Sequence, residues 1–378
     1  MNAAEKAIPT KTIGFIVNPV AGMGGAVGLK GTDGKAILNQ AIALGAKPIA
    51  PQRAETFLTQ LNPAKGSLKL IVGVGNMGQS QAEKCGFSCK VIGESKTETT
   101  SEDTQSIAKG IVTAGVDLLV FCGGDGTSRD IQKAVDLKVP VLGVPTGVKM
   151  HSAIFAVSPQ AAARVVIAYL WGGLPLREAE VMDVDEQAFR QGHLSAELYG
   201  FLLSPYEPHL IQGNKMASPM TENEVENQAA IAIYINEEMK PEILYIVGPG
   251  TTTRTIGDLL DQKKTLLGVD LFQNKKITAK DVNEKQILQT INGKTPKIIV
   301  TPIGGQGFIF GRGNQQISSK VIRQVGLDNI VVVATKSKLD RLQSLRVDTG
   351  DSGLDGEFRA RGIRVVTDYK STQEMAIE

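Results

Sequence analysis

The sequence predicts an α/β protein that begins with a parallel β-sheet covered by helices on both faces. Short apolar runs alternate with helix-like stretches from residue 12 to residue 144. The runs carry Ile, Val and Leu on both faces, which is typical of strands buried in a parallel sheet. Glycine-rich loops follow several runs, and ligands of such sheets bind at the carboxyl ends of the strands. The functional residues are therefore expected in those loops.

The first part of the chain is expected to hold five strands with helices between them. The strands are predicted at Thr12–Val17, Leu68–Val74, Cys89–Gly93, Asp117–Cys122 and Val139–Val144. The helices are predicted at Gly34–Leu44, Ala54–Leu61, Gln79–Lys84, Ser101–Thr113 and Ser128–Asp136. Thr100 before the fourth helix is a capping residue, and the acids at its start suit the helix dipole. Strict alternation of strand and helix implies parallel pairing.

The pattern changes after a helix predicted at Pro159–Trp171. Strands follow at Val181–Asp185 and Ala196–Leu203, and the polar, proline-interrupted stretch 205–221 predicts a loop or lid. Thr221 and Glu224 have the spacing of a capping box, which predicts a helix that reaches Met239. Further strands are predicted at Glu242–Val247, Thr265–Phe272, Lys297–Pro302, Ile330–Ala334, Leu345–Val347 and Ile363–Thr367, and helices at Arg254–Gln262, Ala279–Thr290, Ser318–Val325 and Ser337–Ser344. The length and this change of pattern predict two domains.

Charge and composition exclude several classes of partner. The chain has 41 Lys and Arg against 39 Asp and Glu, so 41 − 39 = +2, and no basic surface for nucleic acid or anionic membrane is expected. No apolar run approaches the ~18 residues that span a bilayer. Three cysteines and an amino terminus without a signal-peptide core indicate a reducing compartment. We expect a cytoplasmic homo-oligomer that acts on a small molecule and contacts neither nucleic acid nor membrane.

Four glycine-rich segments each follow a predicted strand. They are Asn18–Gly25, Gly123–Thr127, Gly143–Lys149 and Gly248–Arg254. Glycine lets the backbone approach a ligand closely, and exposed backbone N–H groups at helix starts bind phosphate. Any one segment could be only a tight turn between a strand and a helix. Four of them, all at strand ends, favour a nucleotide-phosphate site.

The common nucleotide motifs do not explain these loops. No GxxxxGK[ST] sequence occurs, and no GxGxxG follows the first strand. Gly73–Gly78 has the GxGxxG spacing after the second strand, with Glu94 or Glu98 as its acidic partner. Hydride chemistry on a dinucleotide is therefore an alternative, although one motif supports it weakly.

Asp125 is the most specific residue in the loops, because it brings a carboxylate into the glycine turn Gly123–Thr127. In a phosphate site such an acid can accept a hydroxyl proton as the γ-phosphoryl group leaves ATP. It can also hold the Mg²⁺ that bridges the phosphates. The alternative is that Asp125 only caps a helix that begins near Thr127.

The Gly-Gly-Asp-Gly-Thr segment resembles the signature of the NAD kinase and diacylglycerol kinase superfamily. Its surroundings resemble the ATP-NAD kinase-like branch of the AcoX type, and the resemblance runs from about residue 12 to residue 350. The residues that carry it are Asn18–Gly22, Pro140–Val144, Val148–Ala153, Gly250–Thr253 and Pro302–Gly307.

The resemblance implies a two-domain NAD kinase-like fold with the active site between the domains. The N-terminal α/β domain would span residues 1–155, and a C-terminal domain rich in β structure would span 156–378, with its last part able to return to the first domain. The implied enzyme is an NAD kinase-like phosphotransferase. It would use ATP and Mg²⁺ to phosphorylate the adenosine ribose 2′-hydroxyl of NAD and form NADP.

The resemblance also assigns residues to the site. Asp125 would be the general base, and the metal ligands stay undetermined. Nucleotide contacts are expected from Asn18, Gly22, Gly24, Gly25, Gly123, Gly124, Gly126, Thr127, Pro145, Thr146, Gly147, Lys149, His151, Gly250, Thr251, Thr252, Thr253, Arg254, Gly305 and Gln306. Several have plainer alternatives: Lys149 as a solvated lysine, His151 as a structural histidine, the threonines as a helix cap, Arg254 as the i+4 partner of Asp258, and the loop around Gln306 as a hairpin turn.

The acceptor is less defined than the donor site, because the sequence departs from ordinary NAD kinases. Those enzymes have an Asn-Glu or Asn-Asp pair that helps to hold NAD. Here Asn223-Glu224 has the right letters but falls in a helix expected to be exposed, and Pro145-Thr146-Gly147 is closer to the diacylglycerol kinase style. Two alternatives therefore stay open. One is a kinase for another small hydroxyl-bearing metabolite, linked to an acetoin-type pathway, and the other is a nucleotide sensor without catalysis.

Overall fold

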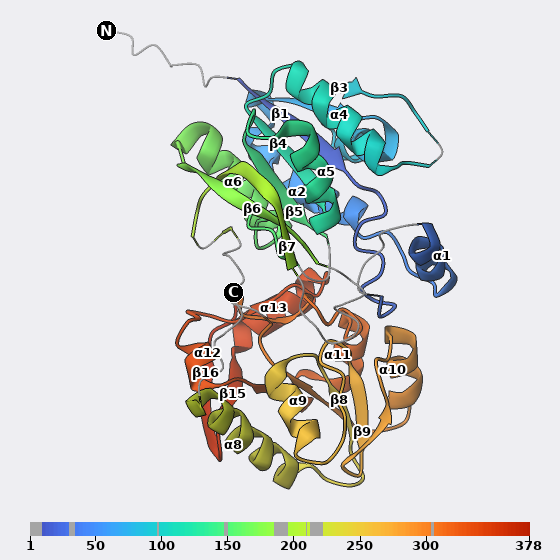
Figure 1. The fold of residues 1–378 in the computed structure, drawn as a ribbon, viewed down its shortest axis with the longest axis vertical. Helices are drawn as coiled ribbons and strands as arrows, with labels where there is room; N and C mark the ends of the chain where they lie inside the picture. The colour runs from blue at the N-terminus through green and yellow to red at the C-terminus, as the bar shows by residue number, and fades with distance from the viewer. Residues whose placement is uncertain are drawn as a thin grey trace. The chain divides into compact units, whose positions relative to one another are not determined.

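The computed structural model describes residues 10–29, 35–96, 98–146, 150–184, 196–208, 210–211, 222–303 and 306–378 (Figure 1). These residues form two compact units. The first takes its described residues from Met1–Gly22, Lys47–Asp185 and Ser195–Asn214, and the second takes them from Met23–Ala46 and Lys215–Glu378. No helix among the described residues is long and apolar enough to cross a membrane.

The first unit contains the predicted parallel sheet. Its strands are β1 (Lys11–Val17), β2 (Leu68–Gly73), β3 (Cys89–Ile92), β4 (Leu118–Gly123) and β5 (Val141–Pro145). Their order is β3-β2-β1-β4-β5, and every neighbouring pair is parallel. The chain builds outward from β1 to β3 and then returns to the other side of β1. The edge between β1 and β4 is therefore the topological switch point, where α/β sheets bind their ligands.

Helices cover both faces of this sheet (Figure 1). They are α2 (Ala50–Gln60), α3 (Gln79–Lys84), α4 (Ser101–Thr113), α5 (Asp125–Val135) and α6 (Pro159–Gly172). Successive residues of β1 point to opposite faces. Phe15 stacks on Phe57 of α2, with ring centroids 5.6 Å apart, whereas Ile16 joins the core formed with Ile107 of α4 and Ile131 of α5. The predicted cap of α4 is confirmed, because Thr100 and Asp103 form a capping box. An antiparallel ribbon of β6 (Leu176–Val184) and β7 (Ala196–Pro205) completes the unit.

The second unit is built on a mixed seven-stranded sheet, which confirms the predicted β-rich second part. The strands are β8 (Leu244–Val247), β9 (Asp270–Gln273), β10 (Lys276–Ala279), β11 (Pro296–Val300), β13 (Ile330–Val333), β15 (Ile363–Asp368) and β16 (Ser371–Met375). Their order is β10-β9-β8-β11-β13-β15-β16. The four central strands β8, β11, β13 and β15 are parallel, and an antiparallel hairpin closes each edge.

Apolar cores lie on both faces of the second sheet. Leu244 and Ile246 of β8 belong to one core, and Tyr245 and Val247 belong to the other, as strand alternation requires. The helices of this unit are α1 (Lys35–Ala43), α8 (Glu222–Glu238), α9 (Thr251–Asp258), α10 (Glu284–Ile291), α11 (Ser319–Val325), α12 (Lys336–Leu339) and α13 (Ser352–Arg361). A short pair, β12 (Phe308–Phe310) and β14 (Arg346–Val347), lies outside the main sheet.

Candidate active site

The loops that follow β1 and β4 are hydrogen-bonded to each other at the switch point. The two strands end together, since Val17 is in register with Cys122. Beyond that pair, the Asn18 N–H donates to the Cys122 carbonyl oxygen at 3.0 Å. The Asn18 side-chain Nδ2 donates to Thr127 Oγ1 at 2.9 Å. Asn18 therefore joins the first glycine loop to the first turn of α5.

The loop after β5 packs against the same two loops. The Thr146 N–H donates to the Gly123 carbonyl oxygen at 3.1 Å. Gly22 has φ +81°, and a Cβ atom there would lie 2.1 Å from the Thr146 carbonyl oxygen, so only glycine fits this approach. Three of the four predicted glycine loops are thus together. The Thr146 hydroxyl oxygen is buried and has no hydrogen-bond partner within the described part of the chain.

Asp125 is held by backbone groups of a different segment rather than by its own helix. It is the first residue of α5, with Gly124 as the N-cap, so the expected helix start near Thr127 is two residues too late. Only 9% of Asp125 is exposed. Its Oδ2 accepts the His151 N–H at 2.7 Å, and its Oδ1 accepts the Ser152 N–H at 2.9 Å. These two contacts join the start of α5 to the segment after β5.

The remaining predicted residues of the first three loops are placed less directly. His151 contributes its backbone N–H to Asp125, whereas the sequence suggested a role only for its side chain. The carbonyl oxygens of Gly24 and Gly25 accept the N–H groups of Leu29 and Gly28, so these glycines lie in a turn. Gly147 and Lys149 lie outside the described residues.

The fourth loop starts α9 in the second unit. Gly250, the N-cap of α9, has φ +131°. Thr253 is buried, and its hydroxyl donates to the carbonyl oxygens of Gly248 at 2.8 Å and Gly250 at 3.0 Å. Thr252 is also buried, whereas Thr251 is exposed. Thr253 therefore has a structural role, and Thr251 is the threonine of this run that a ligand could reach.

Two other predicted positions of the second unit are accounted for in part. Arg254 forms the i+4 ion pair with Asp258, at 3.6 Å, and both side chains are about half exposed. The Gln306 Nε2 atom is buried and has no hydrogen-bond partner among the described residues. Gly305 lies outside them.

The alternative dinucleotide motif Gly73–Gly78 forms a closed turn. Gly78 has φ +140°, and a Cβ atom there would lie 3.0 Å from the Phe15 carbonyl oxygen of β1. The Gly75 N–H donates to the side chain of Gln79 at 3.0 Å. These glycines serve close packing of β2 and α3 against β1, which explains the spacing without a ligand.

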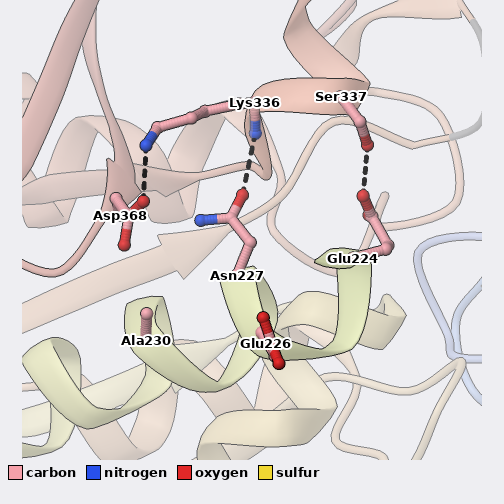
Figure 2. Close-up of a pocket in the computed structure, with 7 residues that line it drawn as sticks. All are labelled: Glu224, Glu226, Asn227, Ala230, Lys336, Ser337 and Asp368. Carbon is pink, nitrogen blue, oxygen red and sulfur yellow. Dashed lines mark hydrogen bonds and ion pairs between the residues drawn. The ribbon is translucent and has the colours of Figure 1, made fainter. Parts of the chain in front are cut away.

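A polar hollow of about 450 Å³ lies in the second unit, at the carboxyl ends of β13 and β15 (Figure 2). Glu224 of α8 points to Ser337, and Lys336 points to Asp368, with 2.5 Å between Lys336 Nζ and Asp368 Oδ2. The Asn227 Oδ1 atom accepts the Lys336 N–H at 3.0 Å. None of the residues predicted for the nucleotide site lines this hollow.

Glu224 corrects one expectation, because the helix at Asn223-Glu224 was expected to be exposed. Only 8% of Glu224 is exposed. Burial alone raises the pKa of its carboxyl, but hydrogen bonds from Ser337, Thr335 and Gln228 outweigh this effect and lower the pKa overall. The carboxylate therefore stays charged and fastens α8 to the start of α12.

Comparison with known proteins identifies related sequences. The chain matches the sequence model of the ATP-NAD kinase N-terminal domain over residues 13–173 and that of the ATP-NAD kinase C-terminal domain over residues 240–375. Among solved structures it is similar to a putative diacylglycerol kinase from Bacillus anthracis str. Sterne, with 14% sequence identity and a TM-score of 0.24. That match covers 47% of this chain and 46% of the other, so it spans less than half of that protein. No curated protein matches the chain.

We predict that Gly22→Ala destabilises the first unit more than Gly115→Ala. Both glycines belong to this unit and have positive φ, +81° and +80°, so each alanine costs on the order of 1–2 kcal/mol of backbone strain. Only at Gly22 would the new Cβ meet a backbone atom, since Gly115 has open space around it. The additional clash costs about 1–3 kcal/mol. Denaturant unfolding of both variants measures the difference, and equal losses would contradict the close approach of the two loops.

A second prediction concerns Lys338, which is partly buried in the second unit and whose ammonium group donates to Thr301 Oγ1 at 3.5 Å. Burial lowers the pKa of Lys338 from 10.5 to about 8, against a partial opposing effect of the Glu224 charge. Between these two pH values the unfolded chain binds a proton that the folded chain does not, so stability rises with pH.

Methionine at position 338 cannot titrate. Within that pH window, the unfolding free energy of the wild-type chain minus that of Lys338→Met should rise by about 1.4 kcal/mol per pH unit. Urea unfolding at pH 8 and pH 10 measures it. A difference that falls as the pH rises would contradict the burial of the Lys338 ammonium group.

Proposed function

We propose a function from one premise: the chain belongs to the ATP-NAD kinase family. The protein is a phosphotransferase that moves the γ-phosphoryl group of ATP to a hydroxyl group of a small molecule. The observation that carries the proposal is the position of Asp125. Its buried carboxylate lies where three glycine loops meet at the switch point of the parallel sheet.

The phosphates of ATP bind at the start of α5 in this proposal. The first N–H groups of a helix have no acceptor within the helix, and the helix dipole favours an anion there. Gly123, Gly124, Gly126 and Thr127 surround this helix start, and the Asn18 amide holds Thr127 in place. The Thr146 hydroxyl group is a further donor for a phosphate oxygen. It is buried and has no hydrogen-bond partner among the described residues.

Asp125 acts as the general base. The acceptor hydroxyl gives its proton to the carboxylate, and its oxygen bonds to the γ-phosphorus. The bond from that phosphorus to the bridging oxygen of ADP breaks, and ADP leaves. A positioned base typically contributes about 10²–10⁴-fold to the rate, so the phosphate donors must supply the rest of the stabilisation.

Mg²⁺ would accompany ATP and neutralise charge on its phosphates. Within the described residues no three His, Cys, Asp or Glu side chains are grouped so as to hold a metal by themselves. This fits Mg²⁺, which keeps several waters and is usually bound through substrate phosphates and one or two carboxylates. Asp125 would be the protein carboxylate in that alternative role.

NAD is the acceptor that we favour, with the adenosine ribose 2′-hydroxyl as the attacking group and NADP as the product. Membership of the ATP-NAD kinase family supports this acceptor. The alternatives are another small hydroxyl-bearing metabolite, linked to an acetoin-type pathway, and a sensor that binds nucleotide without transfer. The three free cysteines agree with a cytoplasmic protein, and we propose a homo-oligomer.

We predict that Asp125→Asn lowers turnover by about 10²–10⁴-fold, because an amide cannot accept the hydroxyl proton. ATP binding should change little, since the variant keeps the size of the side chain and one acceptor oxygen. Steady-state phosphoryl transfer and calorimetric ATP binding measure the two effects. Asp130→Asn is the matched control: Asp130 is an equally buried acid on α5 that accepts a hydrogen bond from Gln105, and its variant should keep wild-type turnover. Wild-type turnover in the Asp125→Asn variant would exclude Asp125 as the general base.

The acceptor is tested directly by incubating the protein with ATP, Mg²⁺ and NAD and detecting NADP. We expect NADP and ADP in equal amounts. ADP formation that depends on another alcohol would assign the protein to the metabolite-kinase alternative. Nucleotide binding without transfer to any acceptor would assign it to the sensor alternative.

A further inference from the structure

Two buried serine hydroxyl groups lie directly behind Asp125. Ser128 of α5 is 0% exposed and Ser152 is 1% exposed, and their Oγ atoms are 3.0 Å apart. The Ser128 Oγ atom is also 2.7 Å from the backbone carbonyl oxygen of Asp125. The Ser152 hydroxyl is within 3.0 Å of both the backbone N–H and the carbonyl oxygen of Met182 in β6. The pair therefore connects α5, the segment after β5 and β6.

The hydroxyl protons of this pair are fully used. Two protons serve three contacts: Ser128 with the Asp125 carbonyl, Ser152 with the Met182 carbonyl, and the contact between the two serines. In one arrangement Ser152 donates to Ser128 and Ser128 donates to Asp125. In a second, Ser128 donates to Ser152 and Ser152 donates to Met182. In a third, Ser128 donates to Asp125 and Ser152 donates to Met182. Water does not reach these atoms, and buried polar groups need partners, so the contacts hold the three elements in fixed positions.

The same segment supplies the donors that hold the Asp125 carboxylate. The backbone N–H of Ser152 donates to Oδ1, and that of the neighbouring His151 donates to Oδ2. The Ser152 side chain thus anchors the peptide whose N–H groups set the direction of the carboxylate. Its hydroxyl does not contact the Asp125 carboxylate itself.

We propose that Ser128 and Ser152 are positioning residues for Asp125, with Ser152 as the main anchor. The proposal rests on the proposed phosphotransferase function. The hydroxyl pair keeps the two backbone donors in place, and these donors set the direction of the Asp125 carboxylate. A displacement of about 1 Å in such a group can cost on the order of 10²-fold in rate.

The test compares Ser152→Thr with Ser152→Val. Both add the same bulk to the buried site, but only threonine keeps a hydroxyl group, so their difference isolates that group. We expect turnover of the valine variant to be at least about tenfold below that of the threonine variant, with the KM for ATP similar in the two. The same pair at Ser204, another fully buried serine of the first unit, is the control and should show no such difference.

A double-mutant cycle with Asp125→Asn separates positioning from a general structural effect. If Ser152 acts through Asp125, the threonine and valine variants should have equal residual turnover once Asp125 is replaced. Equal turnover of the two variants in the wild-type background would overturn the proposal. So would a difference that persists unchanged without Asp125.

Amide hydrogen exchange of the segment around His151 and Ser152 gives a second readout that needs no activity. Exchange in this segment should be faster in the valine variant than in the threonine variant. If the wild-type protein transfers phosphate to no acceptor, the proposed function fails while this measurement still decides the anchoring. Equal exchange in the two variants would then overturn the inference.

Discussion

The site depends on a buried carboxylate that is satisfied by backbone N–H groups. Asp125 comes from the start of α5, whereas its donors, His151 and Ser152, come from the segment after β5. An unpaired charge with this little exposure would cost several kcal/mol, so the two segments form the site only together. The contacts of Asn18 and Gly22 add the loop after β1. The short Gly-Gly-Asp-Gly-Thr motif therefore forms this site only together with the loops that follow β1 and β5.

Much of the first unit was predictable from the sequence, and the reasons are local. Its strands are apolar on both faces, and α4 was predicted with its exact bounds because Thr100 and Asp103 mark its start. Asp125 was also recognisable from a local pattern, because it stands between the glycines of a short motif. Its donors were not, because every residue except proline has a backbone N–H and the sequence gives no sign of which one will be used. Gly147, Lys149 and Gly305 fall outside the described residues, so their roles stay predictions.

The second unit was predicted less completely, because its elements depend on distant partners. The helix α13 was missed: its glycines lower helix propensity, and the packing of Leu354 and Phe358 into the core compensates. The strand β16 is polar and forms by pairing with β15. Glu224 was expected on an exposed helix face, yet Thr335, more than a hundred positions away, binds it. Such contacts have no local pattern in the sequence.

The edge strands of the second sheet separate its parallel centre from the ends of the sheet. An unpaired edge strand offers open N–H and C=O groups to any passing strand, which is the first step of aggregation. Here the parallel centre is not at the edge, because β10 and β16 turn back on each side of it. Both are short, and Lys276 and Glu374 give them opposite charges. The apolar parallel strands at the centre of this sheet are therefore paired on both sides.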